Sequence, residues 1–223
     1  MEDLCRLALE AATAAGASYA DARYVSSRAE RVETKNGTVE GLSSSQSRGI
    51  GIRVIADGAW GFAATSVLTP EALRETAQLA VRIAKSSATT AEKPVVLSEL
   101  EPATDRVAHT ARKDPFDVPL DERIGLLLEC DKLMEQAAEV RLRQGFIRAL
   151  RIEKFFASTE GAEIYQDRIE TGAGIEATAT DGHETQRRTF PNSHGGQMGT
   201  RGWELVEELD LPSEAERIAK EAD

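Results

Sequence analysis

The 223-residue sequence lacks the features that would place it in a membrane or in an oxidising compartment. It contains no run of about eighteen apolar residues, which a transmembrane helix requires. A basic segment followed by an apolar one, typical of a secretory signal, is also missing from its start. Its two cysteines, Cys5 and Cys130, have neither CxxC spacing nor the pattern of a disulfide framework. We therefore expect a cytoplasmic protein with no membrane partner.

Basic residues are also scarce relative to acidic ones. The sequence has 27 Lys and Arg against 38 Asp and Glu, which gives a net charge of −11. Nucleic-acid affinity comes mostly from clustered positive charge that neutralises phosphates. We accordingly expect no nucleic-acid partner.

Histidine is rarer still, with only His109, His183 and His194 in the chain. A catalytic zinc site takes three protein ligands and a water, and an HExxH or HExxxH helix supplies two histidines from adjacent turns. His183-Glu184 imitates the start of such a motif, but Arg187 and Arg188 stand where the second histidine would be. We therefore assign no catalytic residue, no metal ligand and no cofactor to this chain.

What the sequence does have is a series of short β-like runs between Tyr19 and Ser66. Two dipeptides, Asn36-Gly37 and Asp57-Gly58, have the composition of type I′ turns, because both residues tolerate positive φ. These turns predict an antiparallel meander. Its expected strands are Ala22–Thr34, Val39–Ser45, Gly49–Ile55 and Ala59–Ala64.

A second copy of this pattern follows 124 positions later, where Gly161 corresponds to Gly37 and Asp181-Gly182 to Asp57-Gly58. Apolar residues at helical spacing flank each copy. The expected helices are Asp3–Ala15, Pro70–Lys85, Leu120–Glu139 and Trp203–Leu209. We predict an α+β fold of two repeated units, each a helix plus an antiparallel β-meander, with the helices packed on the sheet.

The predicted domain covers residues 1–211, with repeat units 1–85 and 120–211. Residues 86–119 form a proline-containing connection in which only Val95–Leu97 resembles a strand. An acidic tail, 212–223, is interpreted as a solvated helix or as a linker to a further domain. We also expect at least one sheet edge to be free to accept an extended peptide.

Six residues near the second turn are candidates for contact with a peptide or a dimer partner. They are Gly49, Gly51, Arg53, Trp60, Gly61 and Phe62. The glycines lie inside a strand, so they suit close approach of a neighbouring strand or an extended ligand, and not a dinucleotide turn. Arg53 is either a contact residue or part of a solvated face, and Trp60 and Phe62 are either core or an exposed aromatic platform.

Several long motifs resemble the TldD/PmbA family, once called modulators of DNA gyrase, and its TldD-like branch in particular. They are AGASYADARYV, ETKNGTVEG, GIGIRVIADGAWGFAATS, IRALRIEKFFASTEG and QRRTFPNSHGG. The resemblance covers residues 15–211 and corresponds to the amino-terminal half of family members.

The resemblance implies a metallopeptidase that acts on unfolded or small peptides, including the maturation of peptide antibiotics. It also implies a homo- or heterodimer with a TldD/TldE-like partner chain. The family's zinc is bound in the carboxy-terminal half, by an HExxxH helix and a later cysteine, and these are absent here. The chain is then a substrate-presenting or dimer-forming domain that is inactive alone. An alternative is a stand-alone peptide-binding or assembly module that pairs with a full-length family member.

Overall fold

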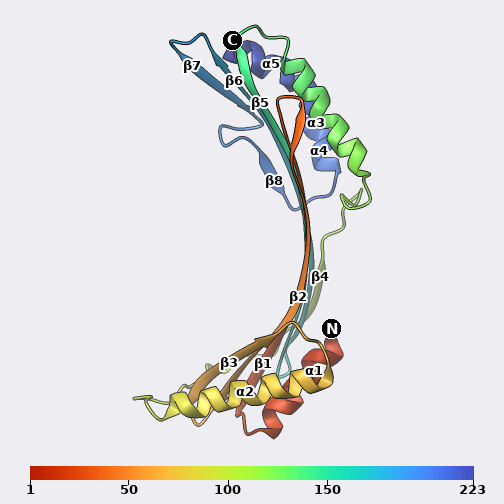
Figure 1. Cartoon of the computed structure of the whole chain (residues 1–223). Coiled ribbons are helices and arrows are strands. Elements are labelled where there is room, and N and C mark those ends of the chain that lie inside the picture. Colours follow the sequence, from red (N-terminus) through yellow and green to blue (C-terminus); the bar gives the residue numbers. More distant parts are fainter. The chain divides into compact units, whose positions relative to one another are not determined.

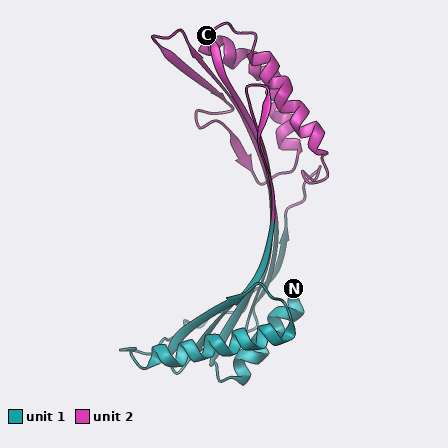
Figure 2. Ribbon diagram, viewed as in Figure 1, with its two compact units in different colours: residues 1–27, 46–108, 152–167 teal, residues 28–45, 109–151, 168–223 magenta.

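The computed structural model describes residues 1–223 and divides them into two compact units (Figure 2). Unit 1 contains residues 1–27, 46–108 and 152–167. Unit 2 contains residues 28–45, 109–151 and 168–223. Neither unit is a continuous segment of the chain, because each takes residues from both predicted repeats.

Eight strands form the sheet (Figure 1). They are β1 (Tyr19–Lys35), β2 (Thr38–Ala56), β3 (Ala59–Thr65), β4 (Thr104–Ala108), β5 (Val140–Ser158), β6 (Glu163–Thr180), β7 (Thr185–Phe190) and β8 (Gln197–Gly199). Their order is β3-β2-β1-β5-β6-β4, and β7 and β8 also pair with β6. The long strands β1, β2, β5 and β6 contribute residues to both units.

The predicted turns are confirmed. Asn36 and Gly37 have φ of 46° and 74°, and Asp57 and Gly58 have φ of 51° and 79°. Gly161 and Gly182 also have positive φ, of 95° and 92°. Only residues that tolerate the left-handed region fit these positions without strain. Both copies of the meander therefore turn at equivalent glycines.

Unit 1 packs two helices, α1 (Glu2–Ala14) and α2 (Pro70–Ala88), on one face of its strands. The Thr69 hydroxyl caps α2 by accepting a hydrogen bond from the Ala72 N–H, and Pro70 occupies the first turn. Alternate strand residues face the helices, as expected where one sheet face is buried. The largest fully buried side chains of this core are Ile50, Ile52 and Val54 of β2 and Leu73 of α2.

Unit 2 packs three helices on its strands: α3 (Leu120–Met134), α4 (Glu204–Leu209) and α5 (Leu211–Ala222). Its core includes Leu127, Met134, Ile147 and Ile175, all almost fully buried. The free thiols of Cys5 and Cys130 lie in the cores of unit 1 and unit 2, and burial raises their pKa to about 11 and about 12. None of the helices is long and apolar enough to cross a bilayer.

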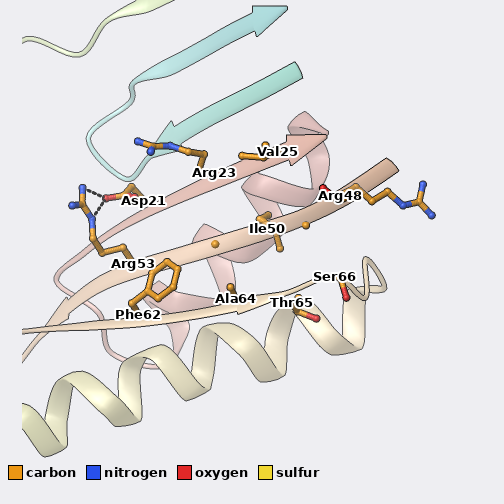
Figure 3. Close-up of a pocket in the computed structure, with 13 residues that line it drawn as sticks. Asp21, Arg23, Val25, Arg48, Ile50, Arg53, Phe62, Ala64, Thr65 and Ser66 are labelled. Carbon is orange, nitrogen blue, oxygen red and sulfur yellow. Dashed lines mark hydrogen bonds and ion pairs between the residues drawn. The ribbon is translucent and has the colours of Figure 1, made fainter. Parts of the chain in front are cut away.

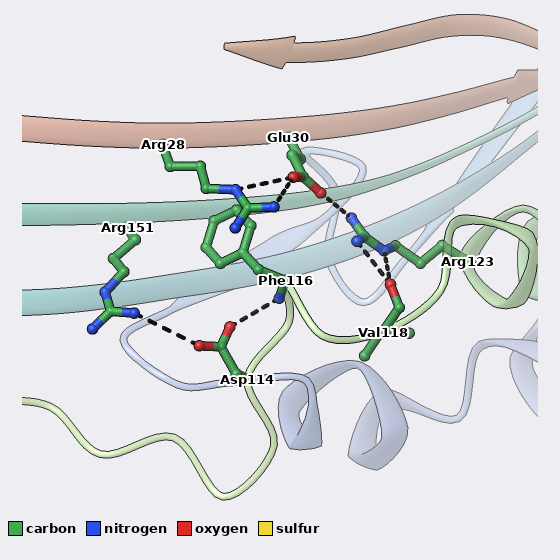
Figure 4. Close-up of polar contacts among 7 residues, drawn as sticks. All are labelled: Arg28, Glu30, Asp114, Phe116, Val118, Arg123 and Arg151. Carbon is green, nitrogen blue, oxygen red and sulfur yellow. Dashed lines mark hydrogen bonds and ion pairs between the residues drawn. The ribbon is translucent and has the colours of Figure 1, made fainter. Parts of the chain in front are cut away.

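Charged side chains anchor the end of the connection within unit 2 (Figure 4). The buried Arg123 guanidinium lies 2.7 Å from a Glu30 carboxylate oxygen and also donates to the Val118 carbonyl. Arg28 pairs with the same carboxylate and stacks 4.4 Å from the centre of the Phe116 ring. These contacts fix the segment that precedes α3 against β1.

Four details of the sequence interpretation are corrected. The runs Val39–Ser45 and Gly49–Ile55 belong to one strand, β2, because polar residues between them remain extended. The third helix ends at Met134 and not at Glu139. Val95–Leu97 forms no strand, whereas the polar segment Thr104–Ala108 does, by pairing with β6 in parallel.

The fourth correction concerns the acidic tail, which is a helix but not a solvated one. Its apolar residues Leu211, Ala215 and Ile218 are buried in the core of unit 2. Its acidic residues lie on the opposite side of α5, where Arg217 pairs with Glu214 and Glu221. The spacing of the apolar residues, three or four apart, is what buries one side of this helix.

Candidate functional site

The helix-free face of unit 1 contains an open groove of about 700 Å³ over β1, β2 and β3 (Figure 3). On β1 alternate residues line it, on the face opposite the one that packs on α1 and α2, whereas on β2 the consecutive residues 47–51 do so. Those that matter here are Asp21, Arg23, Arg48, Arg53 and Phe62, with Gly49 and Gly51 between them.

The glycines make the floor of the groove. A side chain at Gly51 would come within 3.0 Å of the Phe62 ring, and one at Gly49 within 3.1 Å of the Thr65 carbonyl oxygen. Without these side chains, the Phe62 ring can lie over Gly51, and the main chain of β2 is partly exposed to the groove. Phe62 stands beside this floor with 59% of its surface exposed, on the edge strand β3.

Arg53 is held in place by three neighbours. Its guanidinium lies 2.7 Å from the buried Asp21 carboxylate and 4.7 Å from the centre of the Trp60 ring. Tyr19 donates a hydrogen bond to the same carboxylate and meets Trp60 edge-on. Burial partly opposes the charge on Arg53, but the hydrogen bond and charge of Asp21 raise its pKa overall. Burial, with the Asp21 charge, raises the pKa of Tyr19 to about 12.

Arg23 and Arg48 differ from Arg53 because neither forms an ion pair. Arg23 stacks on Phe156, with its guanidinium carbon 5.5 Å from the ring centre, and Arg48 is exposed. The groove thus carries three guanidinium groups and one carboxylate, on a chain whose net charge is −11. This local excess of positive charge suits a ligand with carboxylates.

The structure brings five of the six candidate residues to this face. Gly49, Gly51, Arg53 and Phe62 line the groove, and Trp60 stacks beside Arg53. Gly61 does not belong with them, because it faces α2. A side chain there would lie 2.0 Å from the Ala80 carbonyl oxygen, so Gly61 serves close packing between strand and helix.

Sequence reasoning missed Asp21, Arg23 and Arg48. Asp21 and Arg23 alternate with the buried Ala20 and Ala22, a spacing that could have placed them on the face opposite the core. Arg48 lies in the polar part of β2, where nothing in the local pattern distinguishes a site residue from a solvated one.

The residues of this chain do not fit the zinc that the family resemblance implies. No group of three or more His, Cys, Asp or Glu is arranged to hold a metal ion within residues 1–223. His183 lies in the turn before β7 and His194 in the loop before β8. Both cysteines are buried in helices.

The fold is shared with solved structures of longer proteins. A modulator of DNA gyrase from Thermotoga maritima superposes with a TM-score of 0.76, at 16% identity, over 99% of this chain and 47% of its own. One from Bacteroides thetaiotaomicron gives 0.75, at 13% identity, over 99% and 49%. TldE from Thermococcus kodakarensis gives 0.61, at 19% identity, over 100% and 46%. These likenesses define the class of fold.

The sequence itself identifies the family. The PmbA/TldA metallopeptidase domain 1 matches residues 20–84, and the PmbA/TldA metallopeptidase central domain matches residues 113–223. This chain belongs to the PmbA/TldD metallopeptidase family.

Two curated relatives are longer than this chain. A metalloprotease of Methanothermobacter thermautotrophicus is 26% identical over 204 residues, which are 92% of this chain and 42% of the relative. A metalloprotease of Methanocaldococcus jannaschii is 25% identical over 148 residues, which are 66% of this chain and 32% of the relative. The chain spans less than half the length of either relative.

Proposed function

We propose that this chain is the substrate-presenting, amino-terminal part of a TldD-like zinc metallopeptidase, and that unit 1 holds an extended peptide on its helix-free face. The observation that carries the proposal is the groove floored by Gly49 and Gly51. A floor without side chains lets the main chain of a ligand approach closely. Main-chain contacts bind unfolded chains with little dependence on sequence, which suits the substrates implied for this family.

The side chains around the floor supply the rest of the binding energy. Phe62 offers an apolar surface to a ligand side chain, and Arg53 offers a guanidinium held in place by Asp21 and Trp60. Because the Arg53 guanidinium is fixed before the ligand arrives, little entropy is lost in ordering it.

Hydrolysis is assigned to the zinc-binding carboxy-terminal half that the family resemblance implies. Peptide hydrolysis needs a metal-bound water or a nucleophile activated by a base. The buried thiols have raised pKa values, so they are protonated and poor nucleophiles at neutral pH. The chain alone should therefore bind peptide without cleaving it.

Filling the floor of the groove tests the binding proposal. Gly51→Val should weaken the binding of a fluorescein-labelled, unstructured decapeptide by about tenfold or more, because the added side chain displaces the Phe62 ring and fills the floor of the groove. Gly125→Ala is the matched control, since a side chain at that position in α3 meets nothing within 4 Å. Fluorescence anisotropy measures both. Equal affinity of the wild-type protein and Gly51→Val would refute peptide binding in the groove.

Metal analysis tests the assignment of chemistry. The protein is stripped of metal, incubated with zinc, dialysed and analysed, and the decapeptide is followed by chromatography. We expect no stoichiometric zinc and an intact peptide. One tightly bound zinc per chain, or cleavage that is lost in His183→Ala or His194→Ala, would place an active site in this chain. If this chain does not bind the peptide but does bind a full-length family member, the chain is an assembly module.

A further inference from the structure

Two hairpins, one in each unit, end at equivalent positions. In unit 1, β3 pairs with β2 as far as Ile50↔Thr65. In unit 2, β7 pairs with β6 as far as Ile175↔Phe190. Ile50 and Ile175 are both buried against the helices of their own unit. The two isoleucines therefore hold corresponding positions at the ends of these pairings, 125 residues apart and not 124, because the turn between β6 and β7 is longer than the one between β2 and β3. The residues that precede them on β2 and β6 correspond in the same way.

In unit 2 the chain itself fills the space beyond the end of β7. After the loop that follows Phe190, β8 returns to β6, and Gln197–Gly199 pair antiparallel with Thr171–Ala173. The Gly195 carbonyl oxygen lies 1.9 Å from where a side chain at Gly174 would begin. The edge of β6 is closed at this point.

In unit 1 the same space is open. The residues of β2 that correspond to Thr171–Ala173 are Gln46–Arg48, and all three are exposed. Beyond Ile50, β2 has no strand partner on the side where β3 lay. Gly49 corresponds to Gly174, and Ser66, the first residue after β3, lines the groove at this corner.

The register shows which main-chain groups face the opening. Ala56 and Ala59 flank a two-residue turn, so they form a hydrogen-bonded pair, and bonded pairs then alternate as far as Ile50 and Thr65. Two side-chain contacts join β2 to β1, Ser47 with Ser27 and Arg53 with Asp21, and both fit one register of the two strands. β2 therefore has no bulge between Ser47 and Arg53. Arg48 therefore directs its N–H and C=O groups to the open edge, and we expect Gln46, two residues earlier, to do the same.

Charge indicates what kind of strand would fit there. Arg48 lies at the opening itself, and Arg23 lies on the neighbouring strand β1, and neither has an ion pair. Arg48 and Arg53 are five residues apart on β2, or about 17 Å along an extended strand. Because five is an odd number of residues, the two side chains point to opposite faces of the sheet, so acidic residues on one face of an added strand would meet Arg48 and not Arg53.

We propose that an acidic, extended peptide pairs with Gln46–Arg48 as an added antiparallel strand and places a carboxylate beside Arg48. The added strand takes the position in unit 1 that β8 takes in unit 2. This proposal rests on the proposed function, because it specifies where the peptide lies and which peptides bind.

Proline substitution tests the position of the strand. Gln46→Pro removes an N–H that faces the opening and leaves the bonds between β2 and β1 intact, so the protein should fold. It should weaken binding of an acidic octapeptide by about tenfold. Ala64→Pro is the matched control, because it removes an N–H that faces outward from the edge strand β3. Unchanged binding by Gln46→Pro, or a loss confined to Ala64→Pro, would overturn the proposed position.

Peptide chemistry tests the charge. The octapeptide alternates Glu with Val or Thr and is amidated at its carboxy terminus, and a second peptide carries Gln at each Glu. The Gln peptide should bind several-fold more weakly, and Arg48→Gln should cost about two- to fivefold in affinity for the Glu peptide only. Equal binding of both peptides would refute the acidic preference. If only a peptide with a free terminal carboxylate binds, the arginines recognise the carboxy terminus of the ligand and not its Glu side chains.

Two other outcomes are distinguished by the same proteins. Concentration-dependent dimerisation in analytical ultracentrifugation that Gln46→Pro abolishes would identify a second copy of the chain as the occupant and overturn the peptide proposal. If Gly51→Val abolishes peptide binding but Gln46→Pro does not, the groove binds peptide by another path. If Gly51→Val has no effect, the proposed function itself fails.

Discussion

Units 1 and 2 differ in what covers the strand edge beyond the end of a hairpin. Each has a hairpin that stops at a buried isoleucine, Ile50 or Ile175, and leaves the next residues of a long strand without a partner. Unit 2 closes that gap with β8, whereas unit 1 leaves it exposed. An unprotected sheet edge promotes aggregation, so leaving one open carries a cost. We assign binding, as proposed above, to the open corner and stability to the closed one.

Glycines on the two faces of unit 1 provide the strongest test of this comparison. Gly61→Ala places a side chain 2.0 Å from the Ala80 carbonyl and 2.6 Å from the Ala84 nitrogen, so α2 must move away from β3. We expect a loss of about 3 kcal/mol in the free energy of unfolding, measured with urea. Gly51→Ala on the groove side meets only the movable Phe62 ring and should cost under about 1 kcal/mol. Similar losses would show that the groove floor is as tightly packed as the core.

The equivalent glycines in the two units should also differ. Gly174→Ala pushes against the main chain of the loop before β8, at 1.9 Å from the Gly195 oxygen. Gly49→Ala approaches the Thr65 oxygen at 3.1 Å and needs only a small adjustment. We expect urea unfolding to show a loss of about 2 kcal/mol for Gly174→Ala and about half of that for Gly49→Ala. The reverse order would remove the distinction between a closed and an open corner.

Acid should destabilise the part of unit 2 that follows β8. Glu204 accepts hydrogen bonds from the main-chain N–H groups of Gly202, Arg112 and Lys113, just after β8. Burial alone would raise its pKa, but these bonds lower it from 4.5 to about 2. Because the folded pKa is depressed, the stabilisation is complete above pH 4.5 and is lost as the pH falls toward 2.

The measurement compares the wild-type protein with Glu204→Gln in urea at several pH values. The wild-type protein should be the more stable by a constant margin above pH 5, and the margin should shrink below pH 4.5. A margin that does not change with pH would show that the charge of Glu204 is unimportant.

The smallest effect on stability is expected at Phe62. Its ring is 59% exposed, so Phe62→Ala should change the free energy of unfolding by no more than about 0.5 kcal/mol. Peptide affinity should nevertheless fall several-fold. A large loss of stability with unchanged affinity would assign the ring to the structure and not to the site.

The sequence predicted the turns and most helices because those depend on local chemistry. Asn36-Gly37 and Asp57-Gly58 fit type I′ turns whatever surrounds them, and Thr69-Pro70 begins a helix by its own hydrogen bonding. β4 could not be predicted, since Thr104–Ala108 is exposed throughout and is a strand only because β6 lies beside it.

In the site, too, the residues that could be predicted are those with a local signal in the sequence. Arg53 and Phe62 were found because they stand next to recognisable turns and glycines. Gly61 was misplaced because a glycine within a strand suits a ligand and a helix equally well, and only the position of α2 decides between them. Arg48 could not be recognised from the sequence around it, because what distinguishes it is the unpaired edge of β2, and that edge is a property of the sheet.

The discontinuity of the two units has a consequence for synthesis on the ribosome. Unit 1 includes residues 152–167, so its sheet cannot be completed until that segment has emerged, long after α1 and α2. Contacts between residues so far apart in sequence form slowly, because a long loop must close first. Until then, the edge of β1 that pairs with β5 and the part of α1 that packs against Phe155 remain exposed, and chaperone binding to nascent chains should be strongest during that interval.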